Sequence, residues 1–287
     1  EVFAQHGFDE WVSIEDQYRA YYSSDRDSFT ESSYTSYLRS LGYTPDIREA
    51  DGFEYFSRAF SLRLEERRTK PHFLADRACD FLSHVGEDPF LLYLNFLEPH
   101  MPFFGPRDAQ YPLQDIALPE SFYHQMDERV PAYVRHLREL QYAEGSKNSN
   151  LPLQSEQDWR RLIANYYGLV SLIDAAVGRV LSVLDEQGLS QDTIVVFTSD
   201  HGDMMGAHRL FAKGVMYEEA IKVPLMIRLP HASSAPTRVS APVSQIDLVP
   251  TLLDAMGQSV PPGLPGRSRF AELSGQAFHE KDILVEW

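Results

Sequence analysis

The sequence predicts an α/β fold in which helices cover a mostly parallel central sheet. Its clearest helix has apolar residues at steps of three or four over residues 162–184. The apolar run 193–198, rich in β-branched residues, follows within a few positions, and residues 90–96 form a second run that is apolar nearly throughout. A helix that leads into a continuous apolar strand is typical of βαβ units, in which the strands are buried on both faces.

Composition excludes several classes of protein. The chain has 287 residues, with 26 Lys and Arg against 42 Asp and Glu, which gives a formal net charge of −16. A nucleic-acid partner is not expected, because binding to phosphates requires clustered cationic side chains. Hydrophobic residues make up 43% of the chain, enough to build a core. No run approaches the ~20 consecutive apolar residues of a membrane span, so none is predicted.

The first half of the chain is predicted to contain irregular segments, a helix and one strand. Residues 1–55 have little apolar periodicity and are expected to form irregular surface structure with short helical turns, whereas residues 56–83 carry an apolar face at helical spacing. Asp88 and Pro89 end that helix before the expected strand at 90–96. Residues 104–158 contain many prolines and a polar stretch, and they are expected to form a long loop or insertion. We expect a single domain over residues 1–287.

The second half alternates helices and strands. Gly188 is placed to end the long helix. Strands are expected at 193–198, 224–228 and 283–285, and a short helix at 247–256.

Two polar residues follow the predicted strand 193–198 and are candidates for binding a metal. In parallel sheets, ligands bind beyond the carboxyl ends of the strands, which is where Asp200 and His201 lie. Their carboxylate and imidazole can reach one divalent ion if the backbone turns sharply, and Gly202 permits such a turn. A turn with two hydrogen-bonded polar side chains explains the same local pattern equally well.

A second group of candidates is cationic. His100 lies between two prolines after the predicted strand 90–96, where it could bind an anion or protonate a leaving group; solvated or core histidines are commoner. Lys213, His208 and Arg209 belong to a glycine-containing loop that could surround an anionic group with cationic donors, although a solvated loop is the plainer reading. The chain has no nucleophile elbow, P-loop or zinc-protease motif.

Four ordered segments resemble the sulfatase family of the alkaline-phosphatase superfamily. Residues 193–228, which include T-S-D-H-G-D-M-M-G-A-H-R-L-F-A-K-G, are similar to the family's metal-binding strand and the loop that follows it. The other three segments are residues 89–103, 166–181 and 243–257, and the first of these contains E-P-H-M-P-F. The resemblance implies an alkaline-phosphatase-like fold and favours the metal-binding reading of Asp200 and His201.

The resemblance also implies roles for individual residues. Asp200 and His201 match two divalent-metal ligands, Lys213 matches the lysine that contacts the sulfate, and His100 matches the histidine that assists the leaving group. His208 is a candidate substrate contact. The metal is expected to be Ca²⁺, because aspartates suit a hard cation, with Mn²⁺ as the alternative because imidazole suits softer ions. The substrate would be a small-molecule or glycan sulfate ester, which the net charge of −16 repels at long range.

Some features that the resemblance implies are absent. The sequence has neither the paired aspartates after an N-terminal strand nor the C/S-x-P-x-R segment whose Cys or Ser becomes formylglycine. We therefore expect a fragment that lacks the nucleophile segment and the C-terminal end, and that has no turnover alone. The alternatives are a phosphonate monoester or phosphodiester hydrolase on the same scaffold and a non-catalytic paralogue without a nucleophile.

Overall fold

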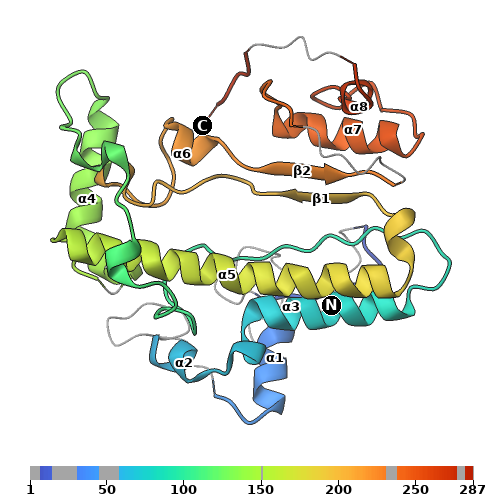
Figure 1. Cartoon of the computed structure of the whole chain (residues 1–287), viewed down its shortest axis with the longest axis horizontal. Helices are drawn as coiled ribbons and strands as arrows, with labels where there is room; N and C mark the ends of the chain where they lie inside the picture. The colour runs from blue at the N-terminus through green and yellow to red at the C-terminus, as the bar shows by residue number, and fades with distance from the viewer. Residues whose placement is uncertain are drawn as a thin grey trace. The chain divides into compact units, whose positions relative to one another are not determined.

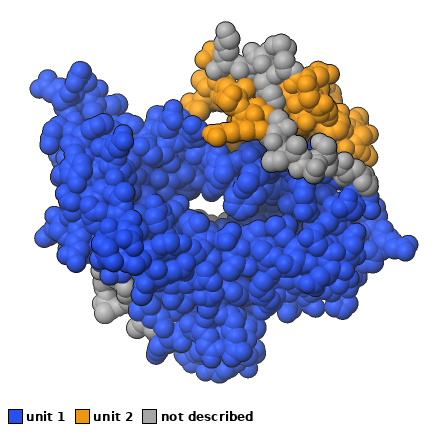
Figure 2. Space-filling model, in the orientation of Figure 1, with its two compact units in different colours: residues 1–231 blue, residues 232–287 orange. Residues whose placement is uncertain are grey.

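The structure is a computed structural model that describes residues 7–14, 31–44, 58–149, 151–230, 238–276 and 282–286. Figure 1 shows its helices and strands along the chain. The chain divides into two units, residues 1–231 and residues 232–287, which Figure 2 colours separately. All five candidate site residues belong to the first unit.

Two long helices lie side by side at the centre of the first unit (Figure 1). Helix α5 (Glu156–Glu186) is the helix predicted from periodicity, and a capping box between Ser155 and Asp158 starts it. Gly188, with φ of 72°, follows its C-terminal end as predicted. Helix α3 (Lys70–His84) packs against α5 through small and branched residues, namely Ala75, Ala78 and Leu82 against Ala176, Val180 and Leu184.

Helix α5 is also the one described helix that is long and apolar enough to cross a membrane. Its most apolar 18-residue window has a mean hydropathy of 1.6. Within the first unit, however, its buried residues contact α3 on one part of the helix and Phe103 and Phe122 on another. Such contacts are typical of a core helix, and a core helix can be as long and as apolar as a helix that crosses a membrane.

The predicted helix at 56–83 is present in three pieces. Helix α2 (Arg58–Arg63) and the 3₁₀ helix η3 (Glu66–Arg68) precede α3. A further helix, α1 (Ser33–Ser40), falls in the segment expected to be irregular. Its buried Tyr34 and Leu38 pack against Phe73 of α3, so tertiary contacts stabilise a helix too short to be stable alone.

The sheet of the described residues has two strands. Strands β1 (Val195–Thr198) and β2 (Leu225–Arg228) confirm the strands predicted at 193–198 and 224–228. They pair antiparallel, with Val195 opposite Arg228 and Thr198 opposite Leu225. β1 therefore ends beside the start of β2, and the site residues follow this end of β1.

Residues 90–96 are extended but pair with no strand in the described part of the chain. Alternate side chains, from Phe90 to Phe96, pack on the α3–α5 core. Between them, Leu91 and Tyr93 are 75% and 72% exposed. The prediction of burial on both faces was wrong, because an apolar run does not reveal whether a second layer covers it. The strand expected at 283–285 is likewise unpaired, within the described residues 282–286.

The segment expected to be a long loop contains helical structure. It includes η4 (Leu113–Asp115), η5 (Glu120–Tyr123) and α4 (Ala132–Ser149). Val134 of α4 packs with Met204 and Leu210, which belong to the segment that follows β1. This helix therefore supports the loop that carries Lys213.

The second unit contains η8 (Gln245–Asp247), α7 (Leu248–Ala255) and α8 (Phe270–Leu273). Helix α7 confirms the helix predicted at 247–256, and Gly257 follows it with φ of 68°. The Asp247 carboxylate accepts a hydrogen bond of 2.7 Å from Arg269 Nε, and both side chains are buried.

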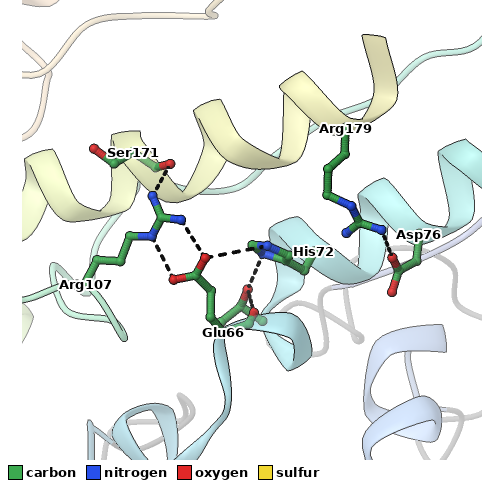
Figure 3. Close-up of polar contacts among 7 residues, drawn as sticks. Glu66, His72, Asp76, Arg107, Ser171 and Arg179 are labelled. Atoms are coloured by element: carbon green, nitrogen blue, oxygen red, sulfur yellow. Dashed lines mark hydrogen bonds and ion pairs between the residues drawn. The ribbon is translucent and has the colours of Figure 1, made fainter. Parts of the chain in front are cut away.

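A polar network joins three segments of the first unit (Figure 3). The Arg107 guanidinium donates to both carboxylate oxygens of Glu66, at 2.8 and 2.6 Å, and to the carbonyl of Ser171 on α5 at 2.6 Å. His72 Nε2 lies 3.7 Å from Glu66 Oε1. The network fixes η3 and residues 105–108 against α5.

This network predicts a dependence of stability on pH. Burial lowers the pKa of His72 although Glu66 favours the proton, so the folded state binds a proton there less readily than the unfolded chain. The contribution of His72 is complete above the unfolded pKa of about 6.5 and decreases as pH falls below it. We expect the urea midpoint of the wild type to fall more between pH 7.5 and 5.5 than that of His72→Gln.

The control for this comparison is His136→Gln, on the exposed face of α4. It should keep the pH profile of the wild type. Glu66 does not contribute to the change in stability between pH 7.5 and 5.5. Arg107 holds the pKa of Glu66 below its usual range, so Glu66 stays ionised at both pH values. Parallel profiles for the wild type and His72→Gln would contradict the expectation.

Candidate functional site

Asp200 and His201 lie two and three residues beyond the end of β1. The Asp200 Oδ1 atom accepts a hydrogen bond of 2.9 Å from the backbone N–H of His201. Its second oxygen lies 3.5 Å from His201 Nε2, and the Asp200 side chain is 84% exposed. A carboxylate oxygen and an imidazole nitrogen are thus close enough to bind one ion.

The hydrogen bond of His201 indicates which ring nitrogen is available. His201 Nδ1 lies 2.8 Å from the carbonyl oxygen of Gly202. A carbonyl can only accept, so we assign the proton to Nδ1, which leaves the Nε2 lone pair for a cation. A backbone partner of this kind orients histidine ligands in metal sites. Asp200 and His201 would supply only part of the ligands of a metal ion. Among the residues that the structure describes, no cluster of three His, Cys, Asp or Glu side chains occurs.

Gly202 allows the backbone after His201 to approach helix α6 (Glu218–Ile221) closely. Its N–H donates to the carbonyl of Ala220 at 2.8 Å. A Cβ atom at this position would lie 2.0 Å from the carbonyl oxygen of Glu219. The glycine was expected for its freedom to turn, whereas in the structure it is needed for this close approach.

Gly202→Ala should therefore displace the segment that carries Asp200 and His201. Overpacking against backbone atoms costs about 1–3 kcal/mol, and we expect the free energy of unfolding to fall by that amount. A matched control is Gly178→Ala on α5, where an added Cβ meets nothing within 4 Å. That substitution should stabilise the chain by about 0.4–1 kcal/mol. Equal effects of the two variants in urea unfolding would contradict the account.

Asp203 organises the loop between His201 and Lys213. Its Oδ1 atom accepts hydrogen bonds from the N–H groups of Met205, at 3.0 Å, and Ala212, at 2.8 Å. Burial raises the pKa of Asp203 to about 6, while these two bonds and the charges of Lys213 and His201 oppose the rise. Asp203 thus connects the start of the loop with the residue just before Lys213.

Gln141 of α4 binds the backbone of the same loop two residues before Lys213. Its side-chain amide donates to the carbonyl of Phe211 at 2.7 Å and accepts from the Phe211 N–H at 3.0 Å. The loop contains four non-glycine residues with positive φ: Met205, His208, Arg209 and Ala212. Such backbone conformations persist only where the surroundings enforce them. Lys213 is therefore carried by a loop whose shape Asp203 and Gln141 fix.

His100 lies in a turn before the core residue Phe103. Its Nδ1 atom is 2.8 Å from the carbonyl oxygen of Met101, so Nδ1 carries a proton and donates it. The ring of Phe103 packs edge-on against Phe211, with centroids 6.2 Å apart. Phe103 follows His100 by three residues and Phe211 precedes Lys213 by two. The two segments that carry His100 and Lys213 therefore share one core cluster.

His208 and Arg209 do not join Lys213 as a group of anion donors. The Arg209 side chain donates to the carbonyl of Phe122 at 3.2 Å and lies over the Phe122 ring. The ring of His208 stacks on that of Tyr217, with centroids 4.2 Å apart and planes inclined by 18°. Burial lowers the pKa of His208, which favours a neutral imidazole.

The roles of four residues in this region were not predicted: Asp203, Gln141, His124 and Tyr217. Asp203 lies in the S-D-H-G-D motif, so its position was visible although its role was not. The other three act through contacts with the loop, and no local pattern marks them.

Comparisons with known proteins agree on one family. The model of the family described as Sulfatase matches residues 1–258. The multifunctional alkaline phosphatase superfamily protein PehA of Trinickia caryophylli is 31% identical over 217 residues, which cover 72% of this chain and 41% of PehA. Arylsulfatase K of Mus musculus is 31% identical over 222 residues, which cover 72% of this chain and 38% of that protein.

A solved structure is similar over most of the chain. The phosphonate monoester hydrolase SpPMH of Silicibacter pomeroyi superposes with a TM-score of 0.70 at 27% identity, over 85% of this chain and 50% of that one. The predicted α/β fold of the alkaline-phosphatase type is thereby confirmed. The 287 residues span about 40% of the length of the two curated relatives.

Proposed function

Because the chain belongs to the sulfatase family of the alkaline-phosphatase superfamily, we propose that the whole protein hydrolyses sulfate esters. The observation that carries the proposal is the arrangement of Asp200, His201 and Lys213 around one loop. Two metal-type donors lie at its start, and Asp203 ties this start to the residue before the lysine. Such an arrangement suits a tetrahedral anion, whose oxygens gain negative charge during the reaction.

Asp200 and His201 would hold a divalent metal ion. When bound, the ion would act as a Lewis acid that withdraws charge from the sulfuryl oxygens. Ca²⁺ fits the exposed carboxylate of Asp200, and Mn²⁺ is the alternative because His201 contributes an imidazole nitrogen. Lys213 would place a second positive charge on the same oxygens. The family resemblance implies formylglycine as the source of the nucleophilic oxygen.

His100 would assist the departing alcohol. Since Nδ1 donates to the carbonyl of Met101, the proton for the leaving oxygen must come from Nε2. The imidazole would therefore be doubly protonated before this step and keep its Nδ1 proton after it. His208 would contact the substrate without donating a proton, since burial keeps it neutral.

A second candidate function is hydrolysis of phosphonate monoesters. The likeness to SpPMH, which covers 85% of this chain, favours it. Phosphonate monoesters also present a tetrahedral anionic centre, so Asp200, His201 and Lys213 would bind both kinds of substrate in the same way. A comparison of kcat/KM for an aryl sulfate and an aryl phosphonate monoester separates the two functions.

Dependence on metal tests the proposal. We expect EDTA to abolish hydrolysis of 4-nitrophenyl sulfate by the whole protein, and Ca²⁺ or Mn²⁺ to restore it. Asp200→Ala should raise the metal concentration for half-maximal activity by about tenfold or more, because one ligand is lost. Glu139→Ala, an exposed carboxylate on α4, is the matched control and should leave this concentration unchanged. Full activity in excess chelator would contradict the proposal.

A further inference from the structure

We propose that Asn165 of helix α5 is a positioning residue for the reaction, because it holds the turn that carries His100. The inference rests on the proposed function and on the role of His100 in it. Asn165 lies on the buried face of α5, and its side chain is fully buried. Its Nδ2 atom donates a hydrogen bond of 2.9 Å to the carbonyl oxygen of Phe103. Phe103 follows His100 by three residues, so this bond holds the backbone next to the proposed acid.

Packing alone does not explain an amide at this position. The residues one turn away on the same buried face, Leu162 and Leu169, are apolar. Among the described residues, no group donates a hydrogen bond to the buried Oδ1 atom of Asn165. A buried acceptor without a donor destabilises the fold, and a leucine, with the same branched shape, would not introduce one. What the amide provides, and a leucine would not, is the fixed position of the Phe103 carbonyl.

The segment that follows the proposed acid runs along α5, and Asn165 makes the first of its contacts. Gly105 lies so close to the helix that an added Cβ atom would be 3.1 Å from the side chain of Leu169. Further along the segment, the Arg107 guanidinium donates to the carbonyl of Ser171 at 2.6 Å. The contacts thus advance along α5 in the order of the chain. Of these contacts, the bond from Asn165 is nearest to the proposed acid in the sequence.

The connection between this bond and the imidazole is short. Only Met101 and Pro102 separate His100 from Phe103. His100 Nδ1 donates to the Met101 carbonyl at 2.8 Å, and the Met101 side chain packs on the core cluster that contains Phe103. Pro102 has a fixed φ, which leaves fewer torsions to absorb a shift. A displacement of Phe103 is therefore passed on to the imidazole, and proton transfer to a leaving group requires hydrogen-bond geometry.

The test compares two substrates of the whole protein, 4-nitrophenyl sulfate and phenyl sulfate. Phenolate is the more basic leaving group and depends more on a proton, so the ratio of the two kcat/KM values measures assistance to the leaving group. We expect Asn165→Leu to raise the ratio of the nitrophenyl to the phenyl ester by about tenfold, through a larger loss on phenyl sulfate. Asn165→Ala, which removes the amide without adding bulk, should raise the ratio as well.

A double-mutant cycle shows whether Asn165 acts through His100. His100→Ala should itself raise the ratio, and adding Asn165→Leu to that variant should change it by less than about twofold. Val180→Ala is the matched control, because Val180 is buried in the α3–α5 core about four turns further along the same helix. It should lower the urea midpoint and leave the ratio of the wild type unchanged.

An unchanged ratio in both Asn165 variants would overturn the inference. So would an equal loss on both substrates, a wild-type ratio in His100→Ala, or an undiminished effect of Asn165→Leu in the His100→Ala background. If the wild type acts on phosphonate monoesters in place of sulfates, the proposed function fails. The positioning role is then judged by the same ratio in the same variants, measured on 4-nitrophenyl and phenyl phenylphosphonate.

Discussion

Replacing Lys213 with Ala is expected to lower kcat of the whole protein on aryl sulfates by about 10²–10³-fold. This is the usual cost of removing one group that stabilises developing charge in the transition state. Asp203 accepts a hydrogen bond from the N–H of Ala212, the residue before Lys213, and the charge of Lys213 lowers the Asp203 pKa, so the lysine follows a residue that is tied to Asp203. The loss should appear in kcat and kcat/KM together, because the oxygens gain charge only as the reaction proceeds.

The matched control is Lys222→Ala. Lys222 lies just after α6 and pairs with Glu218 at 3.6 Å on the exposed surface. Its replacement should change kcat/KM by less than about twofold, as expected for a solvated ion pair. If Lys213→Ala retained the activity of the wild type, its role in binding the sulfuryl oxygens would be wrong.

Replacing Asp247 with Ala should have the largest effect on stability, in the second unit. The Asp247 and Arg269 side chains are 5% and 4% exposed and form a hydrogen bond of 2.7 Å. Asp247 also accepts from the N–H of Arg267 at 3.0 Å. Removal of the carboxylate leaves a buried guanidinium without this partner, which costs about 3–5 kcal/mol. Urea unfolding followed by a probe in residues 238–276 measures the loss.

Asp282→Ala provides the comparison for this variant. Asp282 is an exposed carboxylate in residues 282–286, and its replacement should change the free energy of unfolding by less than about 0.5 kcal/mol. A loss below about 1 kcal/mol in Asp247→Ala would mean that the ion pair contributes little to this unit.

The elements that could be predicted are those whose signal is local. Helix α5 has a long apolar stripe and a glycine after its end, and β1 and β2 are short apolar runs bounded by turn residues. Only short helical turns without fixed bounds were expected where α1 lies, because the stability of this helix depends on packing with α3. Residues 90–96 looked like a strand buried on both faces, but only alternate side chains reach the core. An apolar run specifies an extended segment and leaves its neighbours undetermined.

The candidate site likewise combines residues that a local sequence pattern marks with residues that only the fold brings together. Asp200 and His201 could be found because they follow a strand directly, and the structure places their side chains 3.5 Å apart. The role of Asp203 depends on the fold of residues 205–212, which brings Ala212 back to its carboxylate. Gln141 lies 70 positions before Phe211, and only tertiary structure shows that the two residues meet. The roles of Asp200 and His201 as metal ligands, and those of Lys213, His100 and His208, stay predictions.

The central claim is that the whole protein hydrolyses sulfate esters. Its most direct test is a comparison of kcat/KM for 4-nitrophenyl sulfate and for 4-nitrophenyl phenylphosphonate, measured side by side in the presence of Ca²⁺ or Mn²⁺. Both substrates are monoanions that release 4-nitrophenol, so the difference reports on the tetrahedral centre and on the phenyl group that phosphorus carries in the phosphonate. The account predicts the higher value for the sulfate. A higher value for the phosphonate would contradict it and would assign the site to phosphonate monoester hydrolysis.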